Sequence, residues 1–317
     1  MNVLVTGACG FVGSNLAKYF EHVIDIDLHG LDIKKDVSLP YKKFYTWVEY
    51  PLIDWDIYQA VIHLAGKAHD TRNTSNEQEY YDVNVTIAKK VYDSFRNSKA
   101  RTHIHFSSVK AVTDSVVGVL DESALPNPQT IYGQTKLESE NYIVNNPQKE
   151  HQRVFILRPT MIHGPGNKGN LNLLYSFVKM GVPYPLGAFE NSRSFLGIDN
   201  LMFILDQILQ NQNIKSQTMI LADDEPLSTK TLVRLIAESL DRKPVIWSIP
   251  KHYIRIMARL SNTFHLPFTS ERLNKLTETY LASNARMKTS LGIAKLPNDA
   301  KSSMRKTLLS FAEGEKR

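Results

Sequence analysis

The segment that decides the fold is the amino terminus, MNVLVTGACGFVGSNLAKYF, residues 1–20. Residues 3–6 form a short run rich in β-branched side chains that stops at Gly7. An amphipathic stretch follows over residues 11–20. This order predicts a buried strand, a tight turn and a helix.

Glycines at 7, 10 and 13 give the turn a GxxGxxG spacing. Gly7 allows the sharp change of direction, and Gly10 lets the backbone approach a pyrophosphate at the positive end of the helix. Gly13 lets the helix pack against the strand, and Phe11 and Val12 open the helix beside the same phosphates. The segment therefore predicts a dinucleotide-binding loop.

The acidic residue expected on the cofactor's ribose is Asp27, 20 residues after Gly7 and at the end of a strand predicted over residues 23–27. A carboxylate there accepts hydrogen bonds from the adenosine ribose and repels a 2′-phosphate, which favours NAD over NADP. Asp25 falls on the same face of that strand and is the alternative. The terminal position favours Asp27.

Strand and helix patterns alternate along the first half of the chain. Strands are expected at 60–65, 104–107 and 154–157, and helices at 81–95 and 131–144. This alternation predicts a doubly wound, Rossmann-type parallel sheet covered on both faces, an α/β fold. After residue 159, Gly-, Asn- and Pro-rich loops appear at 163–172 and 181–189, then a helix at 201–209 and a strand at 218–222 that rejoins the sheet. We expect an NAD-binding domain over 1–165, joined by part of 195–225, and a smaller, mostly helical substrate lobe over 166–317.

Composition excludes several classes of protein. The 317 residues are 42% hydrophobic and 22% charged, as in ordinary globular proteins. The single cysteine, Cys9, excludes an internal disulfide and a zinc knuckle, and we expect no metal site. No apolar run is long enough to span a membrane, and the start is not a secretory signal, so a cytoplasmic location is expected. The net charge is +6, the concentrated basic stretch is the tail at 301–317, and no basic stripe interleaved with aromatics predicts nucleic-acid binding.

A catalytic trio is predicted from Ser108, Tyr132 and Lys136. Ser108 follows a strand, and Tyr132 and Lys136 are four residues apart on a predicted helix, so they share one face. An ammonium about 4 Å from a phenol stabilises the phenolate by roughly 4 kcal/mol, enough to lower the phenol's pKa by about 3 units. Tyr132 is therefore expected to act as a general acid/base, with Ser108 hydrogen bonding to the reacting hydroxyl or carbonyl.

With these motifs in place, the chain resembles the extended short-chain dehydrogenase/reductase family, the NAD-dependent nucleotide-sugar epimerases and dehydratases. TGACGFVGSNLA is similar to the family's cofactor loop, and SS followed by YGQTK resembles its catalytic group. HLAG at 63–66, YYDVN at 80–84 and ILRPTMIHGPG at 156–166 resemble further family segments. The resemblance extends over nearly the whole chain.

The resemblance implies further site residues. Those implied for the cofactor, besides the loop and the catalytic pair, are Leu64, Ala65, Gly66, Asn84 and Pro159. Those implied for a UDP-sugar are Ser108, Val109, Lys110, Met161, Asn170, Leu171, Tyr184, Arg193 and Arg272. Arg193 suits a diphosphate because of its fork geometry and permanent charge, with a surface salt bridge as the alternative. For Arg272, a solvated helix position is the alternative to a second phosphate contact.

The chain departs from the family pattern in two places. The first concerns the reaction, and the second concerns the contacts with the sugar. Family members that dehydrate the sugar carry an Asp-Glu pair after the catalytic serine or threonine, where this chain has Val109 and Lys110. This absence argues against a 4,6-dehydratase. Met161 also stands where epimerases often have an asparagine.

The expected reaction is NAD-dependent redox chemistry at C4 of a UDP-hexose or UDP-N-acetylhexosamine. A 4-epimerase working through a transient 4-keto sugar is favoured. One alternative is a reductase of UDP-4-keto-6-deoxy-N-acetylhexosamines in bacterial surface-polysaccharide synthesis. The other is a dinucleotide-binding scaffold without catalysis. The resemblance also implies a homodimer, formed through a helix bundle that includes the Tyr132 helix.

Overall fold

A parallel sheet forms the centre of the computed structural model, which describes residues 1–68, 76–167, 169–263 and 270–314. The described strands of this sheet have the order β10-β7-β5-β4-β1-β2-β3, and all neighbouring pairs are parallel. Their bounds are Asn2–Thr6 (β1), Asp27–Asp32 (β2), Lys43–Thr46 (β3), Ala60–His63 (β4), Thr102–Phe106 (β5), Arg153–Pro159 (β7) and Gln217–Leu221 (β10). The order reverses between β1 and β4, the place where ligands bind at the carboxyl ends of such strands.

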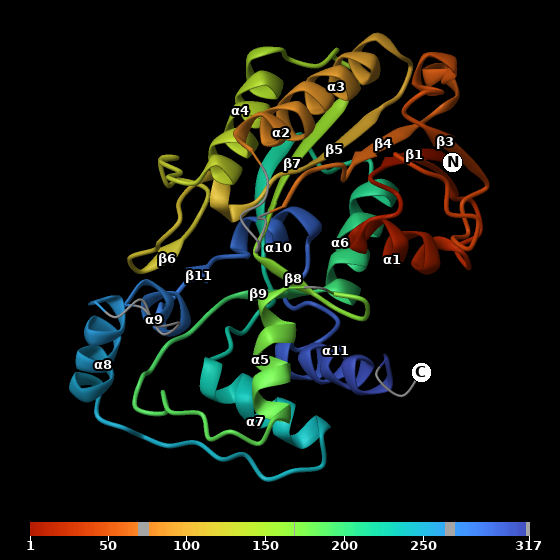
Figure 1. The fold of residues 1–317 in the computed structure, drawn as a ribbon. Helices are drawn as coiled ribbons and strands as arrows, with labels where there is room; N and C mark the ends of the chain where they lie inside the picture. Colours follow the sequence, from red (N-terminus) through yellow and green to blue (C-terminus); the bar gives the residue numbers. More distant parts are fainter. Residues whose placement is uncertain (69–75, 168, 264–269, 315–317) are drawn as a thin grey trace.

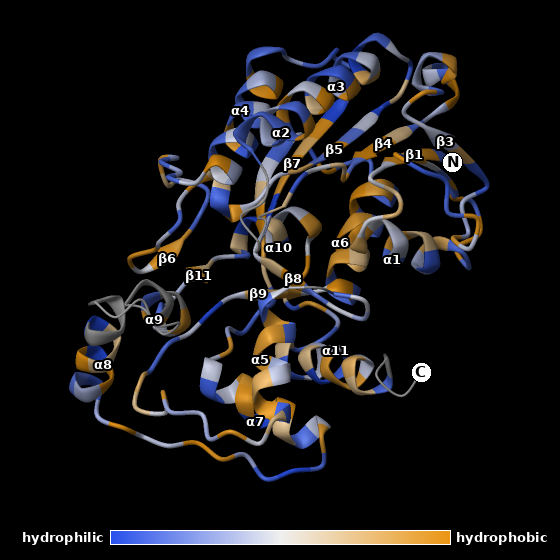
Figure 2. Cartoon of the chain, viewed as in Figure 1, coloured by the Kyte–Doolittle hydropathy of each residue, from blue (hydrophilic) through white to orange (hydrophobic). Residues whose placement is uncertain are grey.

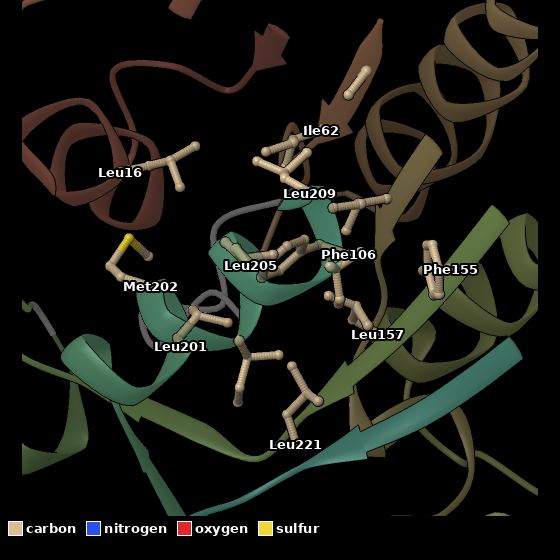
Figure 3. Packing of buried hydrophobic residues seen from close by; sticks show 14 of the residues in the cluster. Leu16, Ile62, Phe106, Phe155, Leu157, Leu201, Met202, Leu205, Leu209 and Leu221 are labelled. Carbon is tan, nitrogen blue, oxygen red and sulfur yellow. The ribbon is translucent and has the colours of Figure 1, made fainter. Parts of the chain in front are cut away.

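Helices cover both faces of the sheet (Figure 1). One face carries α3 (Ile87–Asn97) and α4 (Ile131–Asn145), and the other carries α1 (Phe11–Phe20), α6 (Ile198–Gln210) and α10 (Ala285–Leu291). The alternation of β1 explains both layers, because Val3 and Val5 join the core under α1 and α6 while Leu4 joins the core under α3. Figure 3 shows the first core, in which side chains from α1 and α6 meet those of β4, β5, β7 and β10.

A mostly helical lobe lies beyond the sheet (Figure 1). Its helices are α5 (Asn170–Lys179), α7 (Thr229–Ser239), α8 (Lys251–Thr263), α9 (Ser270–Thr277) and α11 (Ala300–Gly314). Two small parallel sheets also form, β8 (Met161–His163) with β9 (Phe195–Gly197) and β6 (Val119–Leu120) with β11 (Leu281–Ala282). The remaining helical segments are α2 (Glu77–Tyr81), a π-helix at Asp82–Thr86 and 3₁₀ turns at Tyr50–Leu52, Trp55–Ile57 and Val109–Ala111. Among the described residues, no helix has the length and apolarity needed to cross a bilayer.

The predicted Rossmann-type sheet is confirmed, including the return of the chain to its edge as β10. The strand predicted over 23–27 is wrong. Asp25 has a positive φ of 75°, which a strand does not allow, and Ile24 is 85% exposed. The strand begins at Asp27 instead, where Leu28 and Leu31 point into the two cores.

Three histidines lie side by side within the sheet, His63 on β4 and His103 and His105 on β5. Neighbouring rings lie 5.5 to 6.5 Å apart, and all three side chains are buried. Burial lowers the pKa of each, that of His103 to about 3. Because an unfolded histidine has a pKa near 6.5, its stabilising effect is present above that pH and is lost as the pH falls.

We therefore expect His103→Phe to weaken acid destabilisation. His103 lies against Tyr92 and Phe95, which a phenyl ring can contact equally. Between pH 7 and pH 5 one such histidine accounts for about 2 kcal/mol of lost stability. Urea unfolding at both pH values measures the loss, which should be smaller in the variant by that amount. An identical loss in both proteins would show that His103 does not titrate on unfolding.

Candidate active site

A cavity of about 460 Å³ opens where the strand order reverses, between the sheet and the helical lobe. Its lining joins residues from both parts of the chain. The predicted site residues that line it are Val12, Leu64, Gly66, Ser108, Val109, Lys110, Tyr132, Lys136, Pro159, Met161, Asn170, Leu171 and Arg193. The structure therefore brings together most of the side chains that the sequence predicted to act together.

Tyr132 and Ser108 meet because two short elements pack closely. Ser108 caps the 3₁₀ turn Val109–Ala111, accepting a hydrogen bond from the backbone N–H of Lys110 (3.2 Å). Tyr132 lies in the first turn of α4, one residue before Gly133. A Cβ on Gly133 would stand 2.3 Å from the Lys110 carbonyl oxygen. Only glycine therefore lets α4 approach the turn that follows Ser108 so closely.

The electrostatics of Tyr132 differ from the prediction. Burial raises the pKa of the Tyr132 phenol, and only hydrogen bonding with Ser108 opposes that rise. Lys136 donates to the carbonyl of Phe106 (2.9 Å), and burial lowers the pKa of its ammonium to about 8. The expected lowering of the phenol's pKa by Lys136 is not seen with the protein groups alone, because burial raises this pKa and Lys136 is not among the groups that shift it.

Behind Lys136 lies a buried ionic network that the sequence analysis missed. Glu140, one helical turn after Lys136, forms a forked ion pair with Arg158, with Nε to Oε1 at 3.0 Å and Nη2 to Oε2 at 2.5 Å. The hydroxyl of Ser107 also donates to Glu140. The carboxylate opposes the fall in the pKa of Lys136. The signal in the sequence was the four-residue spacing of Lys136 and Glu140, which puts them on one face.

The glycine loop has the shape that a bound diphosphate requires. Gly7 has a φ of +70°, and a Cβ there would lie 2.7 Å from the Ala65 nitrogen. The α1 helix starts at Gly10 with no side-chain cap and no acidic residue in its first turn. Phe11 and Gly13 belong to that turn, and a Cβ on Gly13 would lie 2.5 Å from the Gly7 oxygen. The uncapped N–H groups and the absent side chains fit a dinucleotide.

Asn84 holds together two segments next to the cavity. It lies in the π-helix Asp82–Thr86, and such irregular turns are frequent at functional sites. Its side chain accepts from the N–H of Lys67 (2.7 Å) and donates to the hydroxyl of Thr135 (3.1 Å). Asn84 thus ties the segment after β4 to α4. Gly66 lies in that segment, and a Cβ there would stand 2.8 Å from the Lys136 ammonium.

The assignment of Asp27 to the cofactor is contradicted by its place in the sheet. Asp27 is the first residue of β2, opposite Asn2 at the far end from the glycine loop, and it forms a salt bridge with Lys42. Asp32 ends the strand instead, and its carboxylate accepts a hydrogen bond from the N–H of Cys9 in the loop (2.7 Å). The mistake follows directly from the misplaced strand.

The substrate side of the cavity is partly as predicted. Asn170 and Leu171 open α5, and Arg193 lies across from them, its Nη2 3.5 Å from Glu278. The lining residues that the sequence analysis missed include Ser107, Thr160, Asn167, Ser194, Phe195, Glu278 and Tyr280. The last two follow a helix far along the chain, and no local pattern marked them.

Two predicted substrate residues are not part of this lining. Tyr184 is 5% exposed and packs in the lobe core with Leu186 and Ile254. Tyr184 therefore belongs to the core of the lobe and not to the cavity wall. Arg272 is on α9, but its side chain lies outside the described residues.

The fold and the cavity agree with the protein family to which the sequence belongs. The model of the NAD dependent epimerase/dehydratase family matches residues 3–222, and the chain belongs to that family. The predicted family, the enzyme class of epimerases and dehydratases and the NAD cofactor are thereby confirmed.

Several individual proteins and solved structures are similar to this chain. The chain is 27% identical to a UDP-glucose 4-epimerase of Vibrio cholerae, over 100% of this chain and 97% of the relative. It is also 27% identical to an N-acetyl-α-D-glucosaminyl-diphospho-ditrans,octacis-undecaprenol 4-epimerase of Escherichia coli O157:H7, over 76% and 73%. Among solved structures, MoeE5 in complex with UDP-glucose and NAD has a TM-score of 0.77 at 17% identity, covering 99% of this chain and 100% of the other. A UDP-glucuronic acid 4-epimerase of Bacillus cereus in complex with NAD gives 0.76 at 18% identity, covering 100% of both.

Proposed function

We propose that the protein is an NAD-dependent 4-epimerase of a UDP-hexose or UDP-N-acetylhexosamine. The observation that carries the proposal is the joint lining of one cavity by Ser108, Tyr132 and Lys136, with Gly66 on the cofactor side and Arg193 on the lobe side. The Vibrio relative is named for this reaction and matches along its whole length, which supports the same assignment here.

The chain's own residues account for the proton steps. Tyr132 takes the proton of the 4-hydroxyl as C4 is oxidised and returns a proton when the ketone is reduced. Ser108 holds the same oxygen by a hydrogen bond, and Lys136 supplies a fixed positive charge beside the phenolate. Bound NAD supplies the hydride acceptor and donor together with a positive ring that favours the phenolate. Because the protein groups alone raise the pKa of Tyr132, we expect the enzyme to be active only with the cofactor in place.

Recognition of an anionic substrate fits the charges on the cavity wall. Lys110, Lys136 and Arg193 line it, and Glu278 is the one carboxylate among the described lining residues. The diphosphate is assigned to Arg193 and to the start of α5 at Asn170. We assign residues 166–317 as the lobe that holds the nucleotide sugar, apart from α6, β10 and α10, which belong to the central sheet and its covering helices.

One assay separates the candidate reactions. The purified protein, loaded with one equivalent of NAD and freed of the excess, is given UDP-glucose or UDP-N-acetylglucosamine, and the product is analysed for inversion at C4. Inversion supports the epimerase. No inversion, but NADH consumption with a UDP-4-keto-6-deoxy-N-acetylhexosamine, would identify the reductase. Cofactor binding without turnover across a panel of UDP- and dTDP-sugars would identify a scaffold.

We assign the ribose contact to Asp32, and this assignment has its own test. Asp32→Ser removes the carboxylate that repels a 2′-phosphate, so the NADP:NAD affinity ratio should rise at least about tenfold. Asp27→Ser, at the other end of the same strand, is the matched control and should leave the ratio unchanged. Titration of both cofactors by fluorescence measures the ratio. A change with Asp27→Ser and none with Asp32→Ser would restore the original assignment.

A further inference from the structure

The basic charge of the chain is concentrated around α8. Between Asp241 and Glu271 the sequence has five Lys or Arg and no Asp or Glu, a net charge of +5, against +6 for all 317 residues. The rest of the chain is therefore nearly neutral. The five cations are Arg242, Lys243, Lys251, Arg255 and Arg259.

The α8 helix has apolar residues on two different sides. Ile254 and Ala258 are 2% and 0% exposed and pack into the lobe core. Tyr253, Ile256 and Met257 point the other way and are 57%, 50% and 57% exposed. The helix lies at the outer edge of the lobe (Figure 1), and Figure 2 shows apolar positions along it. About half of each of these three side chains is therefore open to solvent.

A line of basic residues runs along a third side of the helix. Lys251, Arg255 and Arg259 are spaced four residues apart, so they follow one line along the helix, and all three are exposed. At 100° per residue this line falls between the buried face and the outward apolar face. Trp247, 56% exposed, precedes the helix and adds an aromatic ring.

We propose that this surface docks the protein on an anionic lipid membrane. The α8 surface comprises Trp247, Lys251, Tyr253, Arg255, Ile256, Met257 and Arg259. Helices that lie in the bilayer interface combine a basic stripe with aromatic and aliphatic side chains, so that the cations meet lipid phosphates while the apolar groups enter the headgroup boundary. Tryptophan and tyrosine favour that boundary. The three cations of this surface, Lys251, Arg255 and Arg259, lie in a segment of the sequence without acidic residues, which makes the surface complementary to anionic lipid.

The α8 surface is connected to the cavity through its neighbour. Helix α9 (Ser270–Thr277) packs on α8, and the chain then runs directly to Glu278 and Tyr280, which line the cavity. Docking would thus hold the substrate lobe at the membrane surface. The proposal is independent of the reaction at C4.

Vesicle co-sedimentation tests the docking directly. The full-length protein is mixed with phosphatidylcholine vesicles that contain about 30% phosphatidylglycerol, or none. We expect binding to the anionic vesicles, much weaker binding to the neutral ones, and loss of binding as salt rises from about 0.05 M to about 0.5 M.

Variants test whether the α8 surface is the part of the protein that binds the vesicles. K251A/R255A/R259A should weaken binding about a hundredfold, at about fivefold for each cation near the headgroups. Y253S/I256S/M257S should also release the protein, because the apolar groups are lost. The matched control, K301A/R305A/K306A, removes the same charge from the exposed side of α11 and should change binding less than about threefold. All variants should retain turnover of a dissolved UDP-sugar.

Three results would overturn the proposal. The first is failure of the wild type to bind anionic vesicles. The second is an equal loss from the α8 and α11 variants, which would show attraction by overall charge only. The third is a dimer in sedimentation velocity that Y253S/I256S/M257S dissociates, without vesicle binding, which would show that a second copy covers the surface. Since no sugar is present in these assays, their failure leaves the proposed epimerase untouched.

Discussion

Tyr132→Phe is expected to lower kcat of C4 inversion by at least about a thousandfold while leaving NAD binding within about threefold. The substitution removes only the phenolic oxygen, the group on α4 to which we assign the proton of the 4-hydroxyl. The ring keeps its packing against the turn that holds Ser108. Steady-state kinetics with the UDP-sugar and fluorescence titration of the cofactor give the two numbers.

Tyr142→Phe provides the matched control on the same helix. Its hydroxyl donates to Asp93 on α3, at 2.9 and 2.8 Å from the two carboxylate oxygens, away from the cavity. We expect less than about 2 kcal/mol of lost stability and little change in kcat. Activity that survives in Tyr132→Phe, or an equal loss in Tyr142→Phe, would remove Tyr132 from the proposed chemistry.

The second large effect is expected for Gly10→Val. Gly10 has φ −70° and ψ 172°, which any residue adopts, and a Cβ there would meet only the Gly7 oxygen, at 3.1 Å. The fold should therefore tolerate valine, with the free energy of unfolding within about 1 kcal/mol of wild type. The added side chain would occupy the space through which a pyrophosphate reaches the helix N-terminus.

We expect the NAD dissociation constant of Gly10→Val to rise at least about a hundredfold, or about 2.8 kcal/mol. Gly10→Ala, with its smaller side chain, should lie between the variant and wild type. Isothermal titration measures affinity, and urea unfolding of the same samples separates a blocked site from a damaged fold. Unchanged affinity in a folded Gly10→Val would move the diphosphate away from this loop.

The fold was largely predictable because its signals are local. The glycine loop, the strand at 60–63 and the helix over Ile131–Asn145 each follow from hydrophobic pattern or turn chemistry within about fifteen residues. Two strands of the sheet were exceptions. The strand β3 (Lys43–Thr46) was not predicted, and β2 was misplaced because VIDID at 23–27 looks like a strand. Tertiary packing instead selects the segment beginning at Asp27, because Leu28 and Leu31 fill the two cores of the sheet. Because of that shift, the acid that we propose for the ribose is Asp32 and not Asp27.

The residues of the candidate site could be predicted where they belong to a sequence motif. They could not be predicted where they reach the cavity from distant segments of the chain. Ser108, Tyr132 and Lys136 form such a motif, whereas Glu278 and Tyr280 reach the cavity only through the packing of the lobe. The fall in the pKa of Lys136 could not be predicted either, because it depends on burial. From the sequence alone we identified the tail at 301–317 as the concentrated basic stretch. Residues 242–270 have a larger excess of positive charge and no acidic residue.

The most direct test of the central claim follows an isotope at the reacting carbon. UDP-glucose or UDP-N-acetylglucosamine carrying deuterium at C4 is incubated with the purified protein, which has been loaded with one equivalent of NAD and freed of the excess, and the recovered epimer is analysed by NMR and mass spectrometry. If Tyr132 moves only the hydroxyl proton and C4 exchanges a hydride within the closed site, the inverted sugar keeps its deuterium. Inversion with deuterium lost to water, or no inversion of any UDP-hexose, would contradict the account.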